Sequence, residues 1–167
     1  MSYVAEPLGD HHHLDDFDCG NEALNDWLRR HARNASGQGT RTYVVIDVDR
    51  EAVGYFAVAP HTIDREALPR SVGRGAPNQI PAVLLAKLAL DRRLHGQGLG
   101  SELLVVALGT IVHAARRVGG RFVVVDAIDD SAAAFYSYHE FIAVPSDPHR
   151  FVRKLSTVAK ALGQPWP

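Results

Sequence analysis

Hydrophobic positions recur with a period of two in some segments of this chain and with a helical period in others. The first half predicts a strand at residues 3–8 and an antiparallel hairpin of residues 41–48 and 52–59. Between them a helix is predicted to begin after Asn21, a typical N-cap residue, and to end at the glycines near residue 37. Its apolar face comprises Leu24, Trp27, Leu28 and His31.

The second half predicts an irregular excursion at residues 61–79 and then a nearly all-apolar strand, 82–90, of the kind found at the centre of a sheet. An amphipathic helix at 99–118, a strand at 122–125, a helix at 132–139 and two strands at 141–144 and 151–155 follow. This order predicts an α/β fold: a mixed sheet with helices on both faces. We expect one domain at residues 1–157 and a flexible tail at 158–167.

Composition restricts the class of protein. Apolar residues make up 46% of the 167 residues and charged residues 22%, with a net charge of −1, as in ordinary globular proteins. One cysteine, Cys19, excludes an intramolecular disulfide. The N-terminus lacks a signal-peptide pattern and no apolar run reaches membrane-spanning length, so a cytoplasmic protein is expected. The adjacent histidines 11–13 would point in different directions, and no metal site is predicted.

The segment with the most chemical information joins the 82–90 strand to the long helix. It reads Arg92-Arg93-Leu94-His95-Gly96-Gln97-Gly98-Leu99-Gly100, with three alternating glycines where the helix begins. Glycines let a ligand approach the backbone, and the N–H groups and the helix dipole attract an anion there. No Walker lysine follows, because Ser101-Glu102 comes next, and the spacing differs from the dinucleotide fingerprint. The loop predicts a pyrophosphate site of another class.

Leu88-Ala89-Leu90-Asp91, then His95 to Gly100 and Leu103-Leu104, resemble the acetyl-CoA-binding motif of GNAT acetyltransferases. His95 stands where that family has Gln or Arg. Ala133-Ala134-Phe135-Tyr136 followed by Phe141 resembles the family's second landmark, beside the pantetheine arm. The resemblance implies a splayed sheet in which acetyl-CoA, the cosubstrate, lies between diverging strands. The residues implied to contact it are Leu88, Ala89, Leu90, His95, Gly96, Gln97, Gly98, Leu99, Gly100, Ser101 and Phe135.

Acetyl transfer needs a neutral amine, an oxyanion site and a proton for the leaving thiolate. Tyr136 is the candidate general acid that the resemblance implies, and a phenol stays protonated at neutral pH. Tyr138 is interpreted as structural, and a backbone N–H near Leu90 is a candidate oxyanion donor. No residue stands out as a general base. The available carboxylates, Asp91, Glu102 and Asp126, are read equally well as caps or solvated groups.

Within the superfamily the chain resembles toxin acetyltransferases that modify aminoacyl-tRNA and pair with a ribbon-helix-helix antitoxin. The resemblance rests on the segment from Phe17 to Leu28, on Ile80-Pro81, and on Asp129-x-x-Ala132-x-x-Phe135-Tyr136. The usual Phe-Gly-Phe reads His139-Glu140-Phe141 here. A homodimer is expected. The alternative is a housekeeping or resistance acetyltransferase that acts on a small amine or a protein N-terminus. The arginines expected to contact tRNA are Arg29, Arg30, Arg33, Arg116, Arg117 and Arg121.

Overall fold

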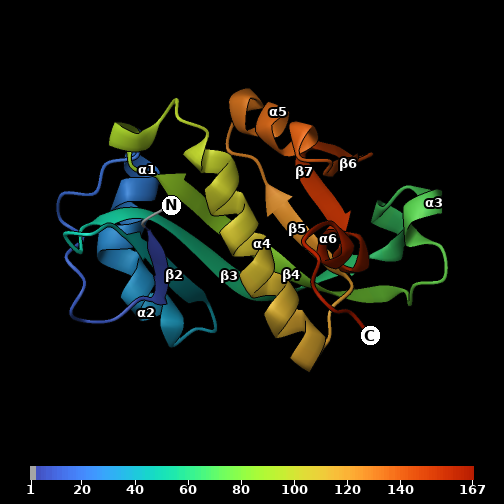
Figure 1. The fold of residues 1–167 in the computed structure, drawn as a ribbon. Coiled ribbons are helices and arrows are strands. Elements are labelled where there is room, and N and C mark those ends of the chain that lie inside the picture. The colour runs from blue at the N-terminus through green and yellow to red at the C-terminus, as the bar shows by residue number, and fades with distance from the viewer. Residues whose placement is uncertain (1–2) are drawn as a thin grey trace. The chain divides into compact units, whose positions relative to one another are not determined.

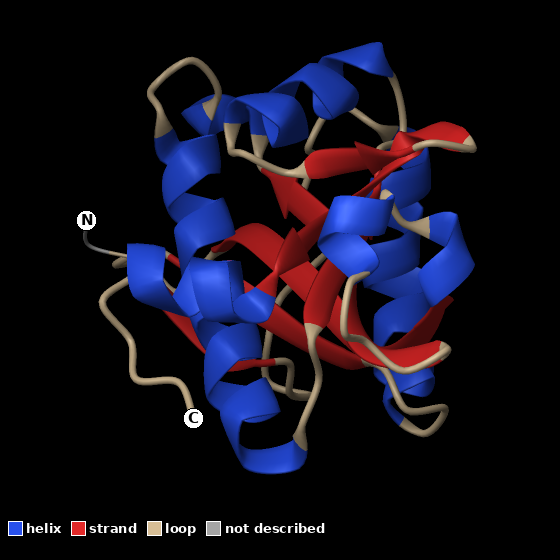
Figure 2. Cartoon of the chain, turned by 90° about the vertical axis from the view of Figure 1, so that its right-hand side faces the viewer, coloured by secondary structure: helices blue, strands red, loops and turns tan. Residues whose placement is uncertain are grey.

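The computed structural model describes residues 3–167 as a seven-stranded sheet with helices (Figures 1 and 2). The strands are β1 Val4–Pro7, β2 Arg41–Ile46, β3 Ala52–Asp64, β4 Gln79–Leu90, β5 Phe122–Asp126, β6 Ile142–Val144 and β7 Asp147–Lys154. The helical segments are α1 Glu22–Asp26, η1 Trp27–His31, α2 Ala32–Ser36, η2 Arg65–Ala67, α3 Arg70–Gly73, η3 Arg92–Leu94, α4 Leu99–Val118, α5 Asp130–Tyr138 and α6 Leu155–Ala161.

The strand order is β1-β2-β3-β4-β5-β7-β6. Strand β4 pairs in parallel with β5, whereas β2 is antiparallel to β1 and β3, and β7 is antiparallel to β5 and β6. The predicted α/β class with a mixed sheet is therefore confirmed. The parallel register runs from Ala82–Phe122 to Leu85–Val125, and β4 continues beyond it to Leu90.

Contacts group the chain into two compact units. The first comprises the residues up to Ala59 together with Ala86–Ala107. Alternation along β2 sends Val44 and Ile46 into a core with Leu28, which lies on the helical segment α1–η1–α2. On the opposite side of the strand, Val45 lines a small cavity with residues of the loop before α4 and of its first turns, including Leu99 and Leu103. This unit thus has helices on both faces of its strands.

The second unit comprises Pro60–Leu85 and Leu108–Pro167. Its core includes Ile80, Phe122 and Val124, with Ile63 from the end of β3. Helix α5 packs on β7, where the Tyr136 and Phe151 ring centroids are 6.3 Å apart. Figure 1 shows α5 beside β7 and β6, in orange and red. Helix α5, which carries Tyr136, is therefore held in place by its packing on β7.

Helix α4 is long and apolar enough to cross a membrane by composition. Its residues Leu103, Leu104, Ile111 and Val112 are instead buried in the protein. They recur at the spacing of one helical face, as the sequence predicted for residues 99–118. Helix α4 is therefore a core helix.

Strand β3 runs five residues further than the hairpin pattern predicted, through Pro60 to Asp64. Ile63 is buried between exposed Thr62 and Asp64, which is the period of a strand, but a proline within such a run argues against strand assignment. Strand β4 also begins earlier, at Gln79. The irregular excursion is correspondingly shorter.

The last predicted strand ends at Lys154, and residues 155–161 form helix α6. Leu155, Val158 and Ala159 are buried, at the spacing of one helical face. The segment expected to fray is therefore helical over its first residues. A second departure lies in the first predicted helix, which contains a π-helical turn at Trp27–His31.

Candidate active site

The glycine loop begins at the end of β4 and leads into α4. Gly96 and Gly98 have φ values of 78° and 75°, a left-handed conformation that side-chain-bearing residues rarely adopt. A Cβ at either position would meet nothing within 4 Å, so glycine is required here by the backbone conformation and not by crowding within the protein. The open space beside both glycines leaves the loop backbone accessible, as an anion-binding loop requires.

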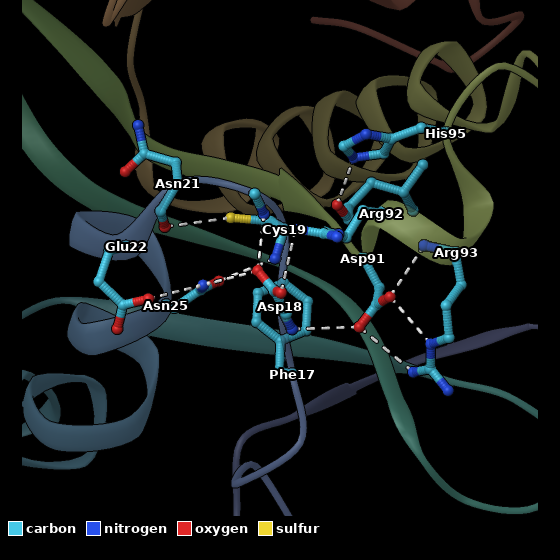
Figure 3. A network of polar contacts seen from close by, with 12 residues as sticks. Phe17, Asp18, Cys19, Asn21, Glu22, Asn25, Asp91, Arg92, Arg93 and His95 are labelled. Carbon is cyan, nitrogen blue, oxygen red and sulfur yellow. Dashed lines mark hydrogen bonds and ion pairs between the residues drawn. The ribbon is translucent and has the colours of Figure 1, made fainter.

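Asp91 fixes the first turn of this loop (Figure 3). Asp91 is only 2% exposed. Its carboxylate accepts hydrogen bonds from the Arg93 backbone N–H and from Arg93 Nε, at 3.0 and 2.9 Å. The second oxygen accepts from the Asp18 N–H at 3.2 Å. Burial by itself would raise the pKa of Asp91, but these hydrogen bonds and the Arg93 charge hold it below its ordinary value. The carboxylate is therefore a structural anchor that is ionised at neutral pH.

The anchor extends into the segment that precedes α1. The Arg92 N–H donates to the Asp18 carbonyl at 2.9 Å, and the Asp18 carboxylate accepts from Asn25 Nδ2 at 3.0 Å. Asn25 is buried, and its Oδ1 accepts from the Cys19 N–H at 2.8 Å. Figure 3 shows these side chains converging between α1 and the end of β4. The motif that starts at Phe17 thus serves to hold the loop, a role that its sequence did not disclose.

His95 occupies the position where the resembled family has Gln or Arg. Its Nε2 lies 2.7 Å from the Leu90 carbonyl, so this nitrogen carries the proton and donates. This hydrogen bond joins the residue that follows η3 to the last residue of β4. Leu88 and Leu90 are half-buried and Ala89 is buried, and all three lie beyond the registered pairing of β4 with β5.

Tyr136 is 6% exposed and lies between aromatic rings. Phe141 and Phe135 approach its ring edge to face, with centroids 5.5 and 5.4 Å away. Within residues 3–167 its hydroxyl has no hydrogen-bond partner, and it is not among the polar atoms sealed from solvent. Burial raises the pKa of the phenol well above its ordinary value. The group is thus a protonated donor with an unused hydrogen bond.

The neighbouring tyrosine is different. Tyr138 is 80% exposed and stacks edge to face on His139. Phe135 is half-buried, with its centroid 4.7 Å from that of His139. The turn after α5 places Glu140 at φ 68°, the conformation for which the family's glycine is suited, and Phe141 is buried beyond it. The turn therefore forms without the glycine.

The three carboxylates considered as bases differ in their surroundings. Asp91 is the loop anchor described above. Asp126 accepts two hydrogen bonds from Arg150, at 2.7 and 2.9 Å, which lower its pKa. Glu102 is exposed in the first turn of α4. Two of the three are thus committed to cationic partners, and an ionised carboxylate so paired is a weak base.

Most of the six arginines expected to bind RNA have partners within the protein. Arg29 donates to the Phe17 carbonyl, and Arg33 donates to the His12 carbonyl at 2.9 Å. Arg30 pairs with Asp26 at 3.0 Å. In the second unit, Arg116 donates to the Pro165 carbonyl at 3.1 Å and Arg121 to the Arg74 carbonyl at 3.3 Å. Arg117 is exposed, with no partner among the described residues.

Glu6, His11 and His12 have ligand atoms within 4.8 Å of one another. The Gly9 N–H donates to His12 Nδ1 at 2.9 Å, so Nε2 carries the proton and donates to Glu6 at 2.8 Å. Both nitrogens of the buried His12 ring are therefore used in hydrogen bonds. A metal ion would have to displace the Glu6 bond and the proton, and the cluster is better explained as a structural one.

Sequence reasoning missed one arrangement near the end of β4. Lys87 Nζ lies 5.4 Å from the centroid of the Trp27 ring, and Trp27 stacks on Tyr55 with centroids 6.0 Å apart. The pattern assigned Trp27 to the apolar helix face but could not reveal its partner on β4. That pairing depends on how the helix crosses the strands.

No protein-family model matches the chain. Its sequence is 37% identical over 150 residues to a tRNA-acetylating toxin of Mycobacterium tuberculosis (strain ATCC 25618 / H37Rv). The alignment covers 89% of this chain and 90% of that relative.

Solved structures give the same result. AtaT complexed with acetyl-methionyl-tRNAfMet matches with a TM-score of 0.86 and 30% identity, over 95% of this chain and 98% of that one. A tyrosine-to-phenylalanine mutant of KacT matches with a TM-score of 0.88 and 26% identity, over 96% and 99%. A similar AtaT mutant, bound to the C-terminus of the antitoxin AtaR and to acetyl-CoA, matches with a TM-score of 0.82 and 28% identity, over 98% and 100%. Since sequence and fold agree over most of both chains, this protein belongs to the family of tRNA-acetylating toxins, which have the GNAT acetyltransferase fold.

Proposed function

We propose that this protein transfers the acetyl group of acetyl-CoA to the α-amine of aminoacyl-tRNA and so blocks translation. The observation that carries the proposal is Tyr136, a buried phenol with an unused hydrogen bond and a raised pKa. A non-catalytic acetyl-CoA sensor would have no need for such a group. The membership of the chain in a family of acetylating toxins supports the choice of substrate.

In this proposal acetyl-CoA binds along the end of β4 and at the glycine loop. Its pantetheine amides pair with the backbone of Leu88, Ala89 and Leu90, much as an added strand does. Its pyrophosphate accepts hydrogen bonds from the loop and from the first turn of α4, at the positive end of the helix dipole. The contacting residues are Leu88, Ala89, Leu90, His95, Gly96, Gln97, Gly98, Leu99, Gly100, Ser101 and Phe135. The proposal includes no metal.

The amine nitrogen attacks the thioester carbonyl, and collapse of the tetrahedral intermediate breaks the C–S bond. Tyr136 gives its hydroxyl proton to the departing thiolate, the amine proton passes to solvent, and the tyrosinate then regains a proton from solvent. No dedicated base is needed, because the pKa of an α-amine is about 7.7–8.0 and roughly one such amine in six to ten is neutral at pH 7. A lysine amine, with a pKa near 10.4, is almost entirely protonated there. Of the three candidate carboxylates, Asp91 and Asp126 are committed to arginines and Glu102 is a solvated residue in the first turn of α4. A site without a dedicated buried base favours an α-amine as acceptor.

The proposal extends to partners. A toxin needs an inhibitor, and we expect a small ribbon-helix-helix antitoxin whose C-terminal segment folds onto this protein. A structural relative, an AtaT mutant, binds the C-terminus of AtaR. We further propose that the enzyme works in the cytoplasm, where its substrate is found, and as a homodimer. Co-expression with the gene directly upstream, followed by co-purification and size-exclusion chromatography, tests both associations.

The deciding assay incubates the protein with labelled acetyl-CoA and tRNA charged with an amino acid. Deacylated tRNA, a lysine-rich protein and a polyamine serve as parallel acceptors. We expect label on charged tRNA only, and its loss on mild alkaline deacylation into an acetylated amino acid. Label on the protein or polyamine but not on charged tRNA would replace the proposal with a small-amine or protein acetyltransferase.

A further inference from the structure

Lys87 lies on the part of β4 that is proposed to hold the cofactor, but its side chain is on the other side. Side chains alternate along a strand, so Lys87 shares a face with Ala89 and not with Leu88 or Leu90. Ala89 is buried in the core with Leu28 and Tyr55, on the α1–η1–α2 side. Lys87 therefore extends toward that helical segment, away from the cavity that Leu90 lines.

The ammonium group of Lys87 is held over an aromatic platform. Its Nζ is 5.4 Å from the Trp27 centroid, within the range of a cation–π contact. Trp27 stacks nearly parallel on Tyr55, at an interplanar angle of 10°. Tyr55 is itself fixed, because it is fully buried and its hydroxyl donates to the Leu24 carbonyl at 2.8 Å. The platform therefore presents the cation in a defined place.

The local sequence gives Trp27 this position. It is the first residue of the π-helical turn Trp27–His31, and its ring contacts Lys87 of β4. Turns of this kind are rare and are frequently found at functional sites. The Trp27 side chain is only half-buried, and so is that of Lys87.

Lys87 carries a charge that no acidic group balances within residues 3–167. It forms no ion pair or hydrogen bond there, whereas Arg30 pairs with Asp26 and Arg93 with Asp91 on neighbouring segments. A half-buried cation without a carboxylate partner attracts an anion from outside the protein. The phosphates of acetyl-CoA are a poor match, since the proposed pyrophosphate site starts near Gly96, beyond the end of the strand.

We propose that Lys87, seated on Trp27, binds a phosphate of the tRNA acceptor end and so selects an amine that is carried on a polynucleotide. The inference rests on the proposed function. In an aminoacyl-tRNA the reacting amine is attached to the terminal nucleoside, and the nearest phosphodiester is on that same nucleotide. A cation beside the strand that holds the thioester can therefore contact this phosphate while the amine reacts.

The test compares two acceptors, an aminoacylated CCA trinucleotide and an aminoacyl ester of adenosine, which lacks phosphate. We expect Lys87→Met to lower kcat/KM about tenfold for the trinucleotide, through KM, and to leave the adenosine ester unchanged. The slope of log(kcat/KM) against log salt for charged tRNA should become shallower by about one. Lys87→Arg should recover most of the loss, and Trp27→Leu should reproduce it. Lys160→Met, which changes an exposed lysine of α6, is the matched control.

Calorimetry with acetyl-CoA and circular dichroism accompany the kinetics. An equal loss for both acceptors, or an unchanged trinucleotide KM, overturns the phosphate contact. Weaker acetyl-CoA binding by Lys87→Met also overturns it, because the anion would then belong to the cofactor. Failure of the proposed function is seen separately, in a wild-type protein that acetylates neither charged tRNA nor the trinucleotide.

Discussion

Tyr136 and Tyr138 stand two residues apart on α5 and meet opposite environments. The Tyr136 ring is buried against Phe141 and Phe151, whereas most of Tyr138 is in solvent. Removal of the Tyr136 hydroxyl leaves no internal hydrogen bond broken, because the group has no partner among the described residues. A change in rate after this substitution can thus be attributed to chemistry.

We predict that Tyr136→Phe lowers the single-turnover rate of acetyl transfer by about 10²–10⁴, the usual contribution of a general acid. The melting temperature and the dissociation constant of acetyl-CoA should be unchanged. Tyr138→Phe removes the same atom from an exposed ring and should retain the full rate. A loss of less than about threefold in Tyr136→Phe would make this residue a packing residue.

Glu140 is the residue at which this chain departs from the glycine of its family, and it adopts the left-handed conformation nevertheless. Its Cβ makes this conformation unfavourable by about 1–2 kcal/mol. The compensating ion pair, 3.2 Å from Arg153, uses an exposed carboxylate and contributes little.

Glu140→Gly should therefore raise the free energy of unfolding by roughly 0.5–1 kcal/mol, after the entropy of the more flexible unfolded chain is included. Glu140→Ala is the control, because it loses the ion pair but keeps the Cβ. Urea denaturation should rank glycine above wild type and alanine at or below it. The reverse order would show that the carboxylate stabilises this turn.

At the scale of elements, the Asp91 anchor joins η3, the end of β4 and the segment before α1. Its carboxylate accepts from Asp18 and Arg93, and the hydrogen bonds lower its pKa. A carboxylate whose pKa is lowered on folding stabilises the protein at pH values above the pKa that it has in the unfolded chain, about 3.9. That contribution is lost as the pH falls through the lower, folded value.

Asp91→Asn should lower the free energy of unfolding at pH 7 by about 1–3 kcal/mol, since buried donors lose their charged acceptor. The difference from wild type should narrow below about pH 4, as the wild-type carboxylate becomes protonated. Acetyl-CoA should also bind more weakly because the loop is less ordered. Asp49→Asn makes the same change at an exposed hairpin residue and should do neither. A gap that stays constant with pH would contradict the assigned role.

Sequence periodicity predicted β2, α4, β5 and α5 to within a few residues, because each has a one-sided or fully apolar pattern that only one element type fits. It missed the end of β3, where Pro60 interrupts a run that is nevertheless alternating. It also missed α6, whose buried Leu155, Val158 and Ala159 occupy barely two turns. Short patterns of this kind are decided by tertiary packing.

The candidate site divides in the same way. The loop glycines and Tyr136 each lie within a short continuous motif, and so they could be proposed from the sequence alone. The anchor and the Lys87–Trp27 pair join residues 60 or more positions apart. Such pairs depend on strand order and on the π turn, which no local pattern encodes.

At the scale of the whole molecule, 18 basic and 19 acidic residues leave no net attraction for a polyanion. RNA binding must then come from local groups that are not already neutralised. Of the six candidate arginines, Arg117 is exposed without a partner, and Arg30 is exposed in a solvent-screened pair. Arg29 and Arg33 instead bind main-chain carbonyls.

Arg30→Glu and Arg117→Glu should weaken tRNA binding without lowering the melting temperature, and acetyl-CoA affinity should be unchanged. Each lost phosphate contact should make the salt dependence of tRNA binding shallower by about one unit of slope. Arg33→Glu should instead lower the melting temperature. Filter binding across a salt series, with calorimetry, separates these effects. If both variants bound tRNA as tightly as the wild-type protein, the RNA would have to bind at another surface.

The distance along the chain between Asp18 and Asp91 has a consequence for biosynthesis. The two residues are 73 positions apart, with the N-terminal partner made first. At about 5–20 residues per second, the ribosome exposes the Asp18 segment roughly 4–15 seconds before its counterpart. When the glycine loop leaves the ribosome, the segment of the same chain to which it docks has therefore already been exposed. A nascent chain therefore gains its anchored glycine loop only after more than half of its 167 residues have been translated.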